Sequence, residues 1–302
     1  MKLTRSTVPA ALCATLLLAT TASASTIISD DFEVDSSASY IVRDEANSTS
    51  GDGTPDSVST FAFDYITAGL PLAPRSQAGD IGGLRFAVNE TSDDAGAADH
   101  ITAFYNAPVG VPAYTMKVDM YMGVESAGGT TEFAHIGVGS DGTDFNSIFT
   151  PIAGDGQFVS ITGEGGSSSD YRHFVSGTPV NSGDNSYLNS DNTTNATGDT
   201  YQAIFPSPPS DFAGSPGNQW ATLTISVNPN RVLYSINGTP IILAENAETA
   251  GFVSLGYTDP FSSVGPHFVV YDNLVVTEVP EPTTCALAVL ALGGLLLKAR
   301  KS

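Results

Sequence analysis

Closely spaced acidic residues are the first candidates for chemistry in this sequence. The loop Gly51-Asp52-Gly53-Thr54-Pro55-Asp56 brings two carboxylates together among small, turn-forming residues. Calcium is bound by several carboxylate or carbonyl oxygens from one such loop, so Asp52 and Asp56 are candidate Ca²⁺ ligands. The preceding positions, Ser48 and Ser50, lack the carboxylates expected there, and a solvated loop is the alternative interpretation.

Two other acidic clusters and four histidines are weaker candidates for metal binding or proton transfer. No two histidines are four residues apart, the spacing that places two imidazoles on one face of a zinc-binding helix. We interpret the acidic clusters as solvated surface and the histidines in strands as structural residues. The clusters are Asp93, Asp94 and Asp99, and Asp141 and Asp144; the histidines are His100, His135, His173 and His267.

Motifs for glycoside hydrolysis and dinucleotide binding are incomplete. Sandwich glycosidases of the laminarinase type space their acids as Glu-x-Asp-x-x-Glu, so that strand alternation points both glutamates into one cleft. Glu33-Val34-Asp35 begins this pattern, but Ser36-Ser37-Ala38 ends it. Gly137-Val138-Gly139-Ser140-Asp141-Gly142 has dinucleotide-binding glycine spacing, but no helix follows, so we predict a hairpin turn. A hydrolase would have to assemble its acid pair from distant strands.

The elements that would position these residues are short strands with alternating polarity. In Tyr114 to Tyr121, Tyr114, Met116, Val118 and Met120 face one way, and the residues between them face the other. The other predicted strands are Val58 to Phe63, Phe133 to Val138, Phe158 to Thr162, Phe252 to Leu255 and Phe268 to Val276. No sizeable helix is predicted between the two ends of the chain. We therefore expect an all-β antiparallel β-sandwich of about a dozen strands, similar to a jelly roll.

One hairpin and two long loops are predicted from the turn residues. Asn237-Gly238 separates two apolar runs, and a type I′ turn needs the positive φ that these residues tolerate. The polar stretches Ser176 to Thr200 and Pro206 to Gln219 are expected as long loops. Loops of this length on a sandwich are either binding surfaces or plain excursions, and the sequence leaves both open.

Charge and cysteine content exclude several function classes. Residues 25 to 279 contain 31 acidic and six basic residues, a net charge of −25. Such a surface repels nucleic-acid phosphates, so no nucleic-acid partner is expected. The only cysteines, Cys13 and Cys285, lie in the end segments. The region between them therefore cannot use disulfides, thiol catalysis or cysteine-ligated zinc.

Both ends of the chain have the composition of export signals. Lys2 and Arg5, an apolar stretch and Ala22-Ser23-Ala24 form a secretory signal peptide, predicted over residues 1–24. At the other end an apolar run follows the prolines and precedes three basic residues. A helix over 283–297 is short for a ~30 Å hydrocarbon core, but its flanking basic side chains can extend to the headgroups. We predict a membrane helix there, a basic tail over 298–302 with Lys298, Arg300 and Lys301 as a cytoplasmic stop, and an ectodomain over 25–278.

The C-terminal segment 279–302 resembles the sorting signal of PEP-CTERM proteins, which are exported bacterial proteins, and the stretch that begins Asp30-Asp31-Phe32 is similar to members of the planctomycete type. Pro280, Glu281 and Pro282 match the sorting motif, and a short helix and a basic tail follow. The resemblance implies processing by an exosortase-type enzyme, attachment to the membrane before processing, and a role associated with exopolysaccharide at the cell surface or outside the cell. The three motif residues would then be a substrate site.

A second segment resembles laminin-G and other concanavalin-like sandwiches. Trp220 opens an alternating run, an aromatic follows at Tyr234, and Asn237-Gly238 makes the turn; Tyr271 to Val276 is similar to a closing strand. Asn237 stands where Asp is often found in that pattern. This fold serves lectins, glycosidases and adhesive modules, so the resemblance implies a concanavalin-like fold and does not select a function.

We therefore expect a non-enzymatic, exported module that binds or organises polysaccharide through loops and exposed aromatics, with Ca²⁺ as a candidate ligand. The candidate aromatics are Tyr171, Tyr187 and Tyr201. For Trp220 a core position at the start of a strand is the preferred interpretation. The alternatives are a glycoside hydrolase that acts on surface polysaccharide, and a purely structural surface protein without a ligand.

Overall fold

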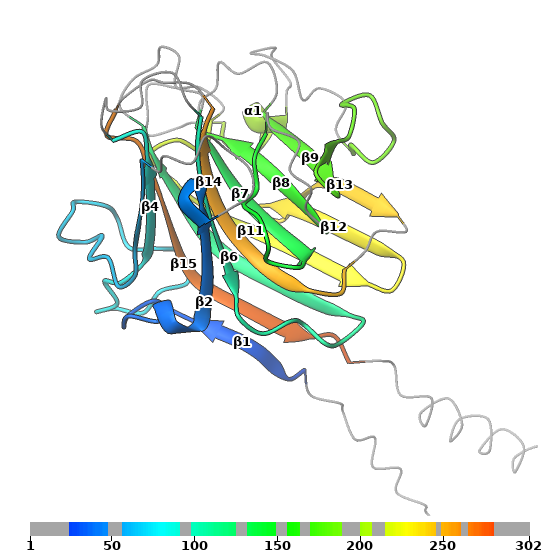
Figure 1. Cartoon of the computed structure of the whole chain (residues 1–302), viewed down its shortest axis with the longest axis horizontal. Coiled ribbons are helices and arrows are strands. Elements are labelled where there is room, and N and C mark those ends of the chain that lie inside the picture. Colours follow the sequence, from blue (N-terminus) through cyan, green and yellow to red (C-terminus); the bar gives the residue numbers. More distant parts are fainter. Residues whose placement is uncertain are drawn as a thin grey trace, which may run out of the picture. The chain divides into compact units, whose positions relative to one another are not determined.

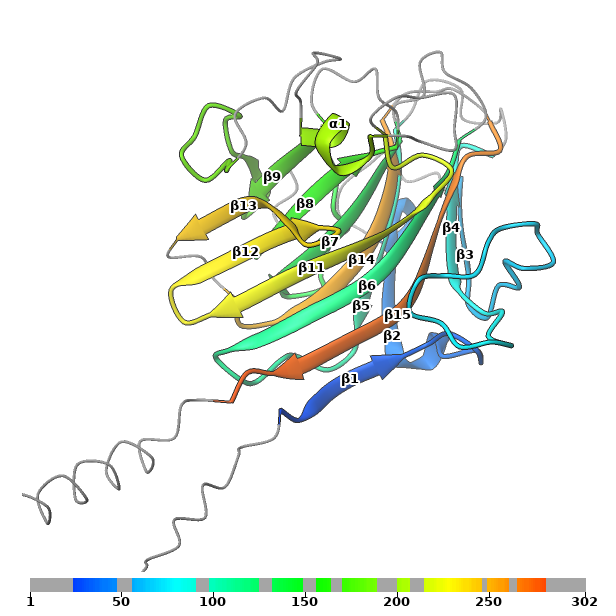
Figure 2. The ribbon, with the colours of Figure 1, turned by 180° about the vertical axis from the view of Figure 1, so that it is seen from behind.

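The structure is a computed structural model that describes most of the region between the two end segments. The described residues are 24–47, 56–90, 98–124, 132–148, 156–163, 170–188, 200–206, 215–245, 249–260 and 265–280. Internal contacts define Ser25–Val279 as one compact unit. This unit is an antiparallel β-sandwich of two sheets, as the alternating sequence pattern predicted (Figures 1 and 2).

Sheet A has eight strands in the order β13-β12-β11-β6-β15-β4-β3, and β1 also pairs with β15. The long strand β15 contacts β6 along its whole length, while its other edge pairs first with β4 and then with β1. The strands of sheet A are β1 (Thr26–Asp30), β3 (Ser57–Thr60), β4 (Leu84–Val88), β6 (Tyr114–Gly123), β11 (Trp220–Asn228), β12 (Arg231–Ile236), β13 (Thr239–Glu245) and β15 (Phe268–Glu278).

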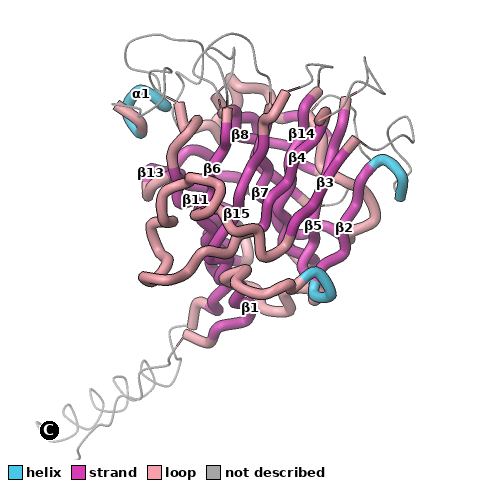
Figure 3. Tube along the Cα trace, turned by 90° about the vertical axis from the view of Figure 1, so that its left-hand side faces the viewer, coloured by secondary structure: helices cyan, strands magenta, loops and turns pink. Residues whose placement is uncertain are grey.

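Sheet B has seven strands in the order β10-β9-β8-β7-β14-β5-β2, all in antiparallel pairs. Figure 3 shows the strands of both sheets and the connections between them. The strands are β2 (Tyr40–Asp44), β5 (Asp99–Tyr105), β7 (Phe133–Ser140), β8 (Gln157–Thr162), β9 (Tyr171–Val175), β10 (Thr178–Pro179) and β14 (Phe252–Asp259).

Helical structure in the described residues is limited to short segments. They are the 3₁₀ turns η1 (Ser37–Ser39) and η2 (Glu45–Asn47), and the helix α1 (Thr200–Ile204). None of the helices in the described part of the chain has the length and apolar character needed to cross a bilayer. The membrane helix predicted over 283–297 and the signal peptide predicted over 1–24 lie outside the described residues, apart from Ala24.

The core between the sheets is built by the predicted alternation. Tyr114, Met116, Val118 and Met120 of β6 are fully buried in the main apolar cluster. The predicted hairpin is also confirmed: β12 and β13 are joined by a turn in which Asn237 has φ of 49° and Gly238 has φ of 80°. The strand predicted over Val58 to Phe63 ends at Thr60 in the structure, as β3. It ends earlier than expected because Ala62 has φ of 53° and turns the chain away.

The segment after β10 joins the two sheets along one side of the sandwich. Leu243 N–H donates to Ser186 O at 2.8 Å, and Leu188 N–H donates to Ile241 O at 3.0 Å. Part of the predicted loop from Ser176 to Thr200 therefore pairs with β13 and covers the backbone groups of an edge strand, which would otherwise be open to pairing with another chain.

One tyrosine links the two sheets through the core. Tyr271 of β15 is fully buried, and its hydroxyl lies 2.8 Å from Gly256 O and 3.0 Å from His135 O in sheet B. The same oxygen accepts the His135 N–H at 3.1 Å. The hydroxyl is thus inserted between β7 and β14 and satisfies backbone groups that the core would otherwise leave unpaired.

We expect Tyr271→Phe to lower the unfolding free energy by about 1–3 kcal/mol, because it leaves buried backbone groups without a partner. Tyr234 provides a matched control: it is fully buried, and its hydroxyl has no hydrogen-bond partner within the described residues. Tyr234→Phe should leave the stability unchanged or raise it slightly. Urea unfolding of the three proteins gives the comparison, and equal effects of the two substitutions would contradict the role assigned to the Tyr271 hydroxyl.

Candidate functional site

The outer face of sheet B, directed away from sheet A, carries a group of neutral polar side chains. Alternation places them there, because their neighbours in each strand belong to the core between the sheets. All are at most 1 % exposed. We call this group the polar face; it consists of His100, Thr102, His135, Ser160, Ser254 and Thr258.

Thr258 lies between the two histidines of the polar face. Its Oγ1 is 2.7 Å from His135 Nε2, 3.1 Å from His100 Nδ1 and 3.3 Å from Asn146 O. If Thr258 donates its single proton to His100 Nδ1 or to Asn146 O, then His135 Nε2–H donates to Thr258. His135 Nδ1 is then a lone-pair acceptor.

Burial keeps both imidazoles uncharged. The pKa of His100 is lowered to about 3 by burial, and the pKa of His135 is lowered to about 3 by burial and then by the neighbouring His100. Glu45 Oε1 is 3.8 Å from His100 Nε2. The two imidazoles are therefore neutral donors and acceptors over the whole physiological pH range.

Residues 141–148 lie across part of the polar face. The Phe145 ring stacks on His100 at a centroid distance of 4.7 Å. Asn146 N–H donates to Thr102 Oγ1 at 2.8 Å, and the Asn146 side chain donates to Ser254 Oγ at 3.2 Å. Residues 141–148 are thus held on the polar face by contacts to side chains of strands β5 and β14.

Two buried polar atoms on the polar face have no hydrogen-bond partner within the described residues. They are His135 Nδ1 and Ser160 Oγ. The two residues lie directly opposite each other in the pairing of β7 with β8, so their Cβ atoms are about 5 Å apart on the same face. An unsatisfied buried polar group costs about 1–3 kcal/mol, so a small donor or acceptor placed between them would stabilise the fold.

A glycine gives the His135 ring its space. Gly256 lies directly opposite His135 in the pairing of β14 with β7. A Cβ atom at this position would lie 3.4 Å from His135 Cδ2 and only 2.9 Å from Ile101 O and Thr102 Oγ1. A larger residue at 256 would therefore displace the imidazole or the neighbouring strand.

Sheet A carries a different polar cluster on its own outer face, built around two carboxylates. Asp119 of β6 and Asp272 of β15 are paired directly and are at most 1 % exposed. The loop 61–83 covers them, and Arg75 Nε donates to Asp119 Oδ1 at 3.0 Å. Thr222 also donates to this oxygen at 2.7 Å.

Every carboxylate oxygen of this pair accepts at least one hydrogen bond from the chain itself. Asp119 Oδ2 accepts from Arg75 N–H and from the Asn273 side chain, each at 3.3 Å. Asp272 Oδ1 accepts from Asn273 N–H at 2.6 Å, and Oδ2 accepts from Ser76 at 2.7 Å and Tyr65 at 3.0 Å. A hydrolytic acid pair needs free oxygens facing a substrate, whereas this pair attaches the loop to the sheet.

The three tyrosines predicted as exposed ligand-binding aromatics lie in the interior. Tyr171 and Tyr201 are fully buried and Tyr187 is 8 % exposed. Tyr171 and Tyr187 stack at a centroid distance of 5.9 Å, and Tyr201 lies against Tyr171 at 6.2 Å. They are core residues of the sandwich and do not form an aromatic surface.

Trp220 starts a strand, as predicted, but it lies outside the main core and is only partly buried. It opens β11, is half-buried, and packs edge-on against Tyr65 and Tyr121. Its indole N–H donates to Pro71 O at 2.7 Å. Trp220 therefore helps to hold the loop 61–83 on sheet A.

The acidic loops give mixed outcomes. Asp52 lies outside the described residues, while Asp56 N–H donates to Asp99 Oδ1 at 3.1 Å. Asp99 and Asp144 are buried, so the interpretation of their clusters as solvated surface is wrong for these two residues. The parts of the chain that the structure describes contain no group of three or more His, Cys, Asp or Glu side chains placed to hold a metal ion.

The remaining motifs are located as follows. Pro280 is the last described residue, and Glu281, Pro282 and the basic stop residues lie outside the described part of the chain. Gly137 and Gly139 lie within β7, and Gly142 follows it in the segment 141–148, with Gly139 and Gly142 at positive φ. No helix follows, as predicted, but the connection to β8, which begins at Gln157, is longer than the predicted hairpin turn.

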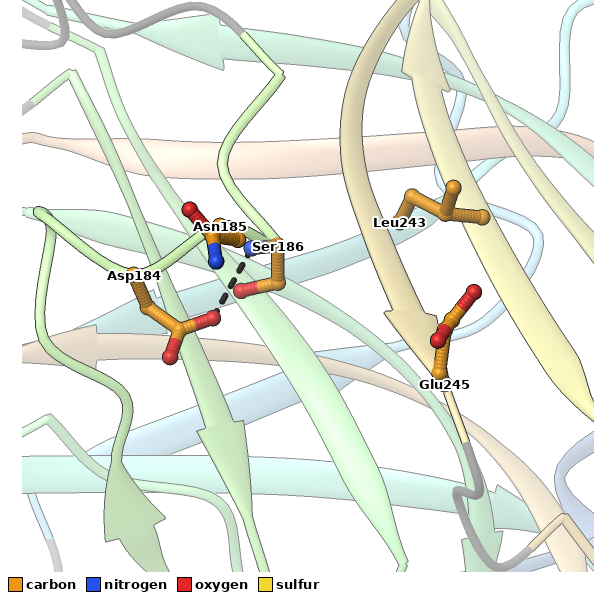
Figure 4. Close-up of a pocket in the computed structure, with 5 residues that line it drawn as sticks. All are labelled: Asp184, Asn185, Ser186, Leu243 and Glu245. Atoms are coloured by element: carbon orange, nitrogen blue, oxygen red, sulfur yellow. Dashed lines mark hydrogen bonds between the residues drawn. The ribbon is translucent and has the colours of Figure 1, made fainter.

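A pocket lies beside the edge of sheet A (Figure 4). Its lining residues come from the segment after β10 and from the end of β13. They are Asp184, Asn185, Ser186, Leu243 and Glu245. The Asp184 carboxylate accepts the Ser186 N–H at 2.8 Å, and Glu245 pairs with Arg231 at 3.4 Å. Both acids are therefore already engaged by neighbouring groups of the chain.

Comparisons with known proteins give no family. No protein-family model matches the chain, and no curated protein matches its sequence. Among solved structures, the carbohydrate recognition domain of Emp46p in its metal-free form is 7% identical, with a TM-score of 0.45 over 83% of this chain and 94% of that chain.

Two further solved structures resemble the chain to a similar degree. A Bacillus subtilis protein of unknown function with a galectin-like fold is 11% identical, with a TM-score of 0.42 over 84% of this chain and 97% of that chain. The exoplasmic/lumenal domain of VIP36, in a Ca²⁺- and mannose-bound form, is 10% identical, with a TM-score of 0.41 over 81% and 85%. At such low values these similarities carry no functional argument.

The carboxylate pair makes a pH-dependent contribution to stability that can be measured. The pKa of Asp272 is raised from 3.8 to about 6, chiefly by burial and to a smaller extent by the nearby Asp119, while hydrogen bonds from Ser76, Tyr65 and Asn273 act in the opposite direction. The folded state therefore binds the proton more tightly than the unfolded state between about pH 4 and 6. The contribution of Asp272 to stability is largest below pH 4 and is lost as the pH rises through 6.

In Asp272→Asn this titration is absent. The unfolding free energy of the wild type minus that of the variant should therefore fall by about 1–2 kcal/mol between pH 4 and pH 7, after allowance for solvent screening. Urea unfolding at several pH values measures it. Asp184→Asn is the control: hydrogen bonds from Ser186 lower the pKa of Asp184, so its contribution to stability is lost only as the pH falls below about 4, and the difference between the wild type and Asp184→Asn should change little between pH 4 and pH 7. A difference between the wild type and Asp272→Asn that is constant with pH would contradict the assignment.

Proposed function

We propose that this chain is an exported, non-catalytic module of the cell surface or the extracellular polysaccharide matrix, and that it binds hydroxyl-rich ligands at the polar face of sheet B. The observation that carries the proposal is the pair of unpartnered buried atoms, His135 Nδ1 and Ser160 Oγ. Both atoms are closed to solvent, so a ligand would have to displace part of the chain that covers them. A sugar hydroxyl in that position can donate to the imidazole nitrogen and accept from, or donate to, the serine hydroxyl.

The chemistry of the polar face supports binding rather than catalysis. Its histidines are held neutral by burial, and its hydroxyls come from Ser and Thr side chains. Such a face stabilises an uncharged polar ligand by hydrogen bonds and offers no carboxylate pair for glycoside hydrolysis. The carboxylates Asp119 and Asp272 lie on the other sheet, where Arg75 and four hydrogen-bonding neighbours already occupy them.

Export and sorting form the second part of the proposal. The sequence of residues 1–24 supports cleavage by a signal peptidase, and Pro280-Glu281-Pro282 supports processing by an exosortase-type enzyme. The protein would be attached to the membrane through residues 283–297 until that processing releases or transfers it. The lack of cysteine in residues 25–279 is compatible with any redox compartment.

Ser160→Ala tests the binding site. Because the Ser160 hydroxyl is buried without a partner, its removal should leave the stability of the free protein unchanged or slightly higher. The same substitution should weaken binding of a responsive neutral oligosaccharide about five- to thirtyfold, the equivalent of about 1–2 kcal/mol for one lost hydrogen bond. Glycan-array screening of the full chain would select the ligand, and calorimetric titration would measure its affinity.

Ser226→Ala is the matched control, since Ser226 is a half-buried serine of β11 in sheet A. It should leave affinity unchanged. A wild type that binds no glycan of the array, or a Ser160→Ala protein that binds like the wild type, would contradict the proposed site. Release of sugar products by the wild type would favour the hydrolase alternative.

Mass spectrometry of the native protein from separate cell fractions tests the proposed export. We expect molecules that begin at Ser25, and a fraction outside the cytoplasm that lacks the basic tail. The controls are whole-cell samples taken early after induction, in which uncleaved chains should be enriched. Full-length chains in every fraction would contradict both processing steps.

A further inference from the structure

The first residue after the predicted cleavage site is attached to the last strand of the sandwich. Ser25 O accepts the Glu278 N–H at 2.8 Å, and the Ser25 hydroxyl donates to Glu278 Oε2 at 2.7 Å. β1 then continues the pairing along β15, with Thr26 opposite Thr277 and Asp30 opposite Leu274. Figure 2 shows β1 beside this part of β15.

Among the described residues, no Lys or Arg forms an ion pair with Glu278. The residue opposite Glu278 on β6 is Tyr114, whose buried hydroxyl stays uncharged because burial raises its pKa. Lys117 is paired further along the strand with Val275, and Asp30 lies at the far end of β1. A cation added next to Glu278 would therefore not compete with a described Lys or Arg side chain for the carboxylate.

Cleavage after Ala24 would supply that cation. It converts the Ser25 amide into an α-ammonium group, which is charged below a pKa of about 8. Within one residue the backbone nitrogen lies about 3 Å from the side-chain oxygen, so this ammonium group would form within roughly 6 Å of the Glu278 carboxylate. Rotation of the glutamate side chain can shorten this distance to a direct contact.

We propose that removal of the signal peptide creates an ion pair between the new α-ammonium group of Ser25 and the carboxylate of Glu278, which fastens the edge strand β1 to β15. The pair does not exist while residue 24 is attached, since an amide carries no charge. The export cleavage thus acts as a switch that stabilises one edge of sheet A after translocation. This inference rests on the cleavage site that is part of the proposed function.

The reactivity of the α-amine provides the test. The full chain is expressed in an export-competent bacterial host, the processed protein is purified, and its N-terminus is identified by mass spectrometry. Acylation of the Ser25 amine at pH 8 and low salt is then followed in the wild type and in Glu278→Gln. The ion pair should slow acylation about 1.2- to threefold in the wild type, because an exposed pair of 0.2–1 kcal/mol raises the pKa of the amine and lowers its uncharged fraction at pH 8.

Glu245→Gln is the matched control, because Glu245 is also a glutamate at the end of a strand of sheet A. It should acylate like the wild type, and 1 M NaCl should remove the difference between the wild type and Glu278→Gln. As a second readout, amide protons of β1 should exchange faster in Glu278→Gln than in Glu245→Gln.

Equal acylation rates in the wild type and Glu278→Gln would overturn the ion pair while leaving the export proposal intact. An N-terminus other than Ser25 would instead overturn the cleavage site itself, and with it the premise of the ion pair. Neither outcome bears on glycan binding at the polar face, so the two proposals can fail separately.

Discussion

The hydroxyl of Tyr271 is the contact on which the arrangement of both polar clusters depends. It crosses the core from sheet A and bonds to the backbone of His135 and Gly256 in sheet B. Because these two residues are opposite each other on β7 and β14, the tyrosine fixes the sheets relative to each other behind the polar face. The next residue in the chain, Asp272, points the other way and joins the carboxylate cluster. One strand therefore connects the two polar regions of the sandwich.

The carboxylate cluster shows how a buried charge can serve a structural purpose. Burying Asp119 and Asp272 side by side is unfavourable, and the raised pKa of Asp272 reflects that cost. The cost is offset by Arg75 and by donors from the loop 61–83, which cannot reach these oxygens unless the loop lies on the sheet. Removing one partner from such a network would leave other buried polar groups without hydrogen bonds. The loop is therefore held more firmly than its apolar contacts alone would allow.

The alternation of polar and apolar residues predicted the positions of the strands well, but it predicted less well which sheet faces are buried. For β6 the apolar and polar positions separate clearly, and the predicted inward residues Met116 and Val118 are buried. The same pattern correctly placed Asp119 on the opposite face, but no local signal shows that a distant loop covers this face and buries the carboxylate. In β9 both faces are buried in part, so Tyr171 could not be assigned to core or surface from its neighbours. His135 and Ser160 could be placed in strands, but their pairing depends on register between β7 and β8, which the sequence alone does not specify.

The charge of the chain constrains the ligand that the polar face can take. With a net charge of −25 over residues 25–279, the protein repels anionic polymers at long range, and salt only shortens that range. The polar face itself contributes no charge, since His100 and His135 are neutral. Arg172 lies opposite Ser160 and Arg43 lies opposite Thr102 on the same outer face, so the long-range repulsion of an anionic polysaccharide is opposed by two cations close to the proposed site. The donors and acceptors of His135 and Ser160 match the hydroxyls of a neutral glycan, so at this site the hydrogen-bonding groups, rather than the net charge, define the class of ligand.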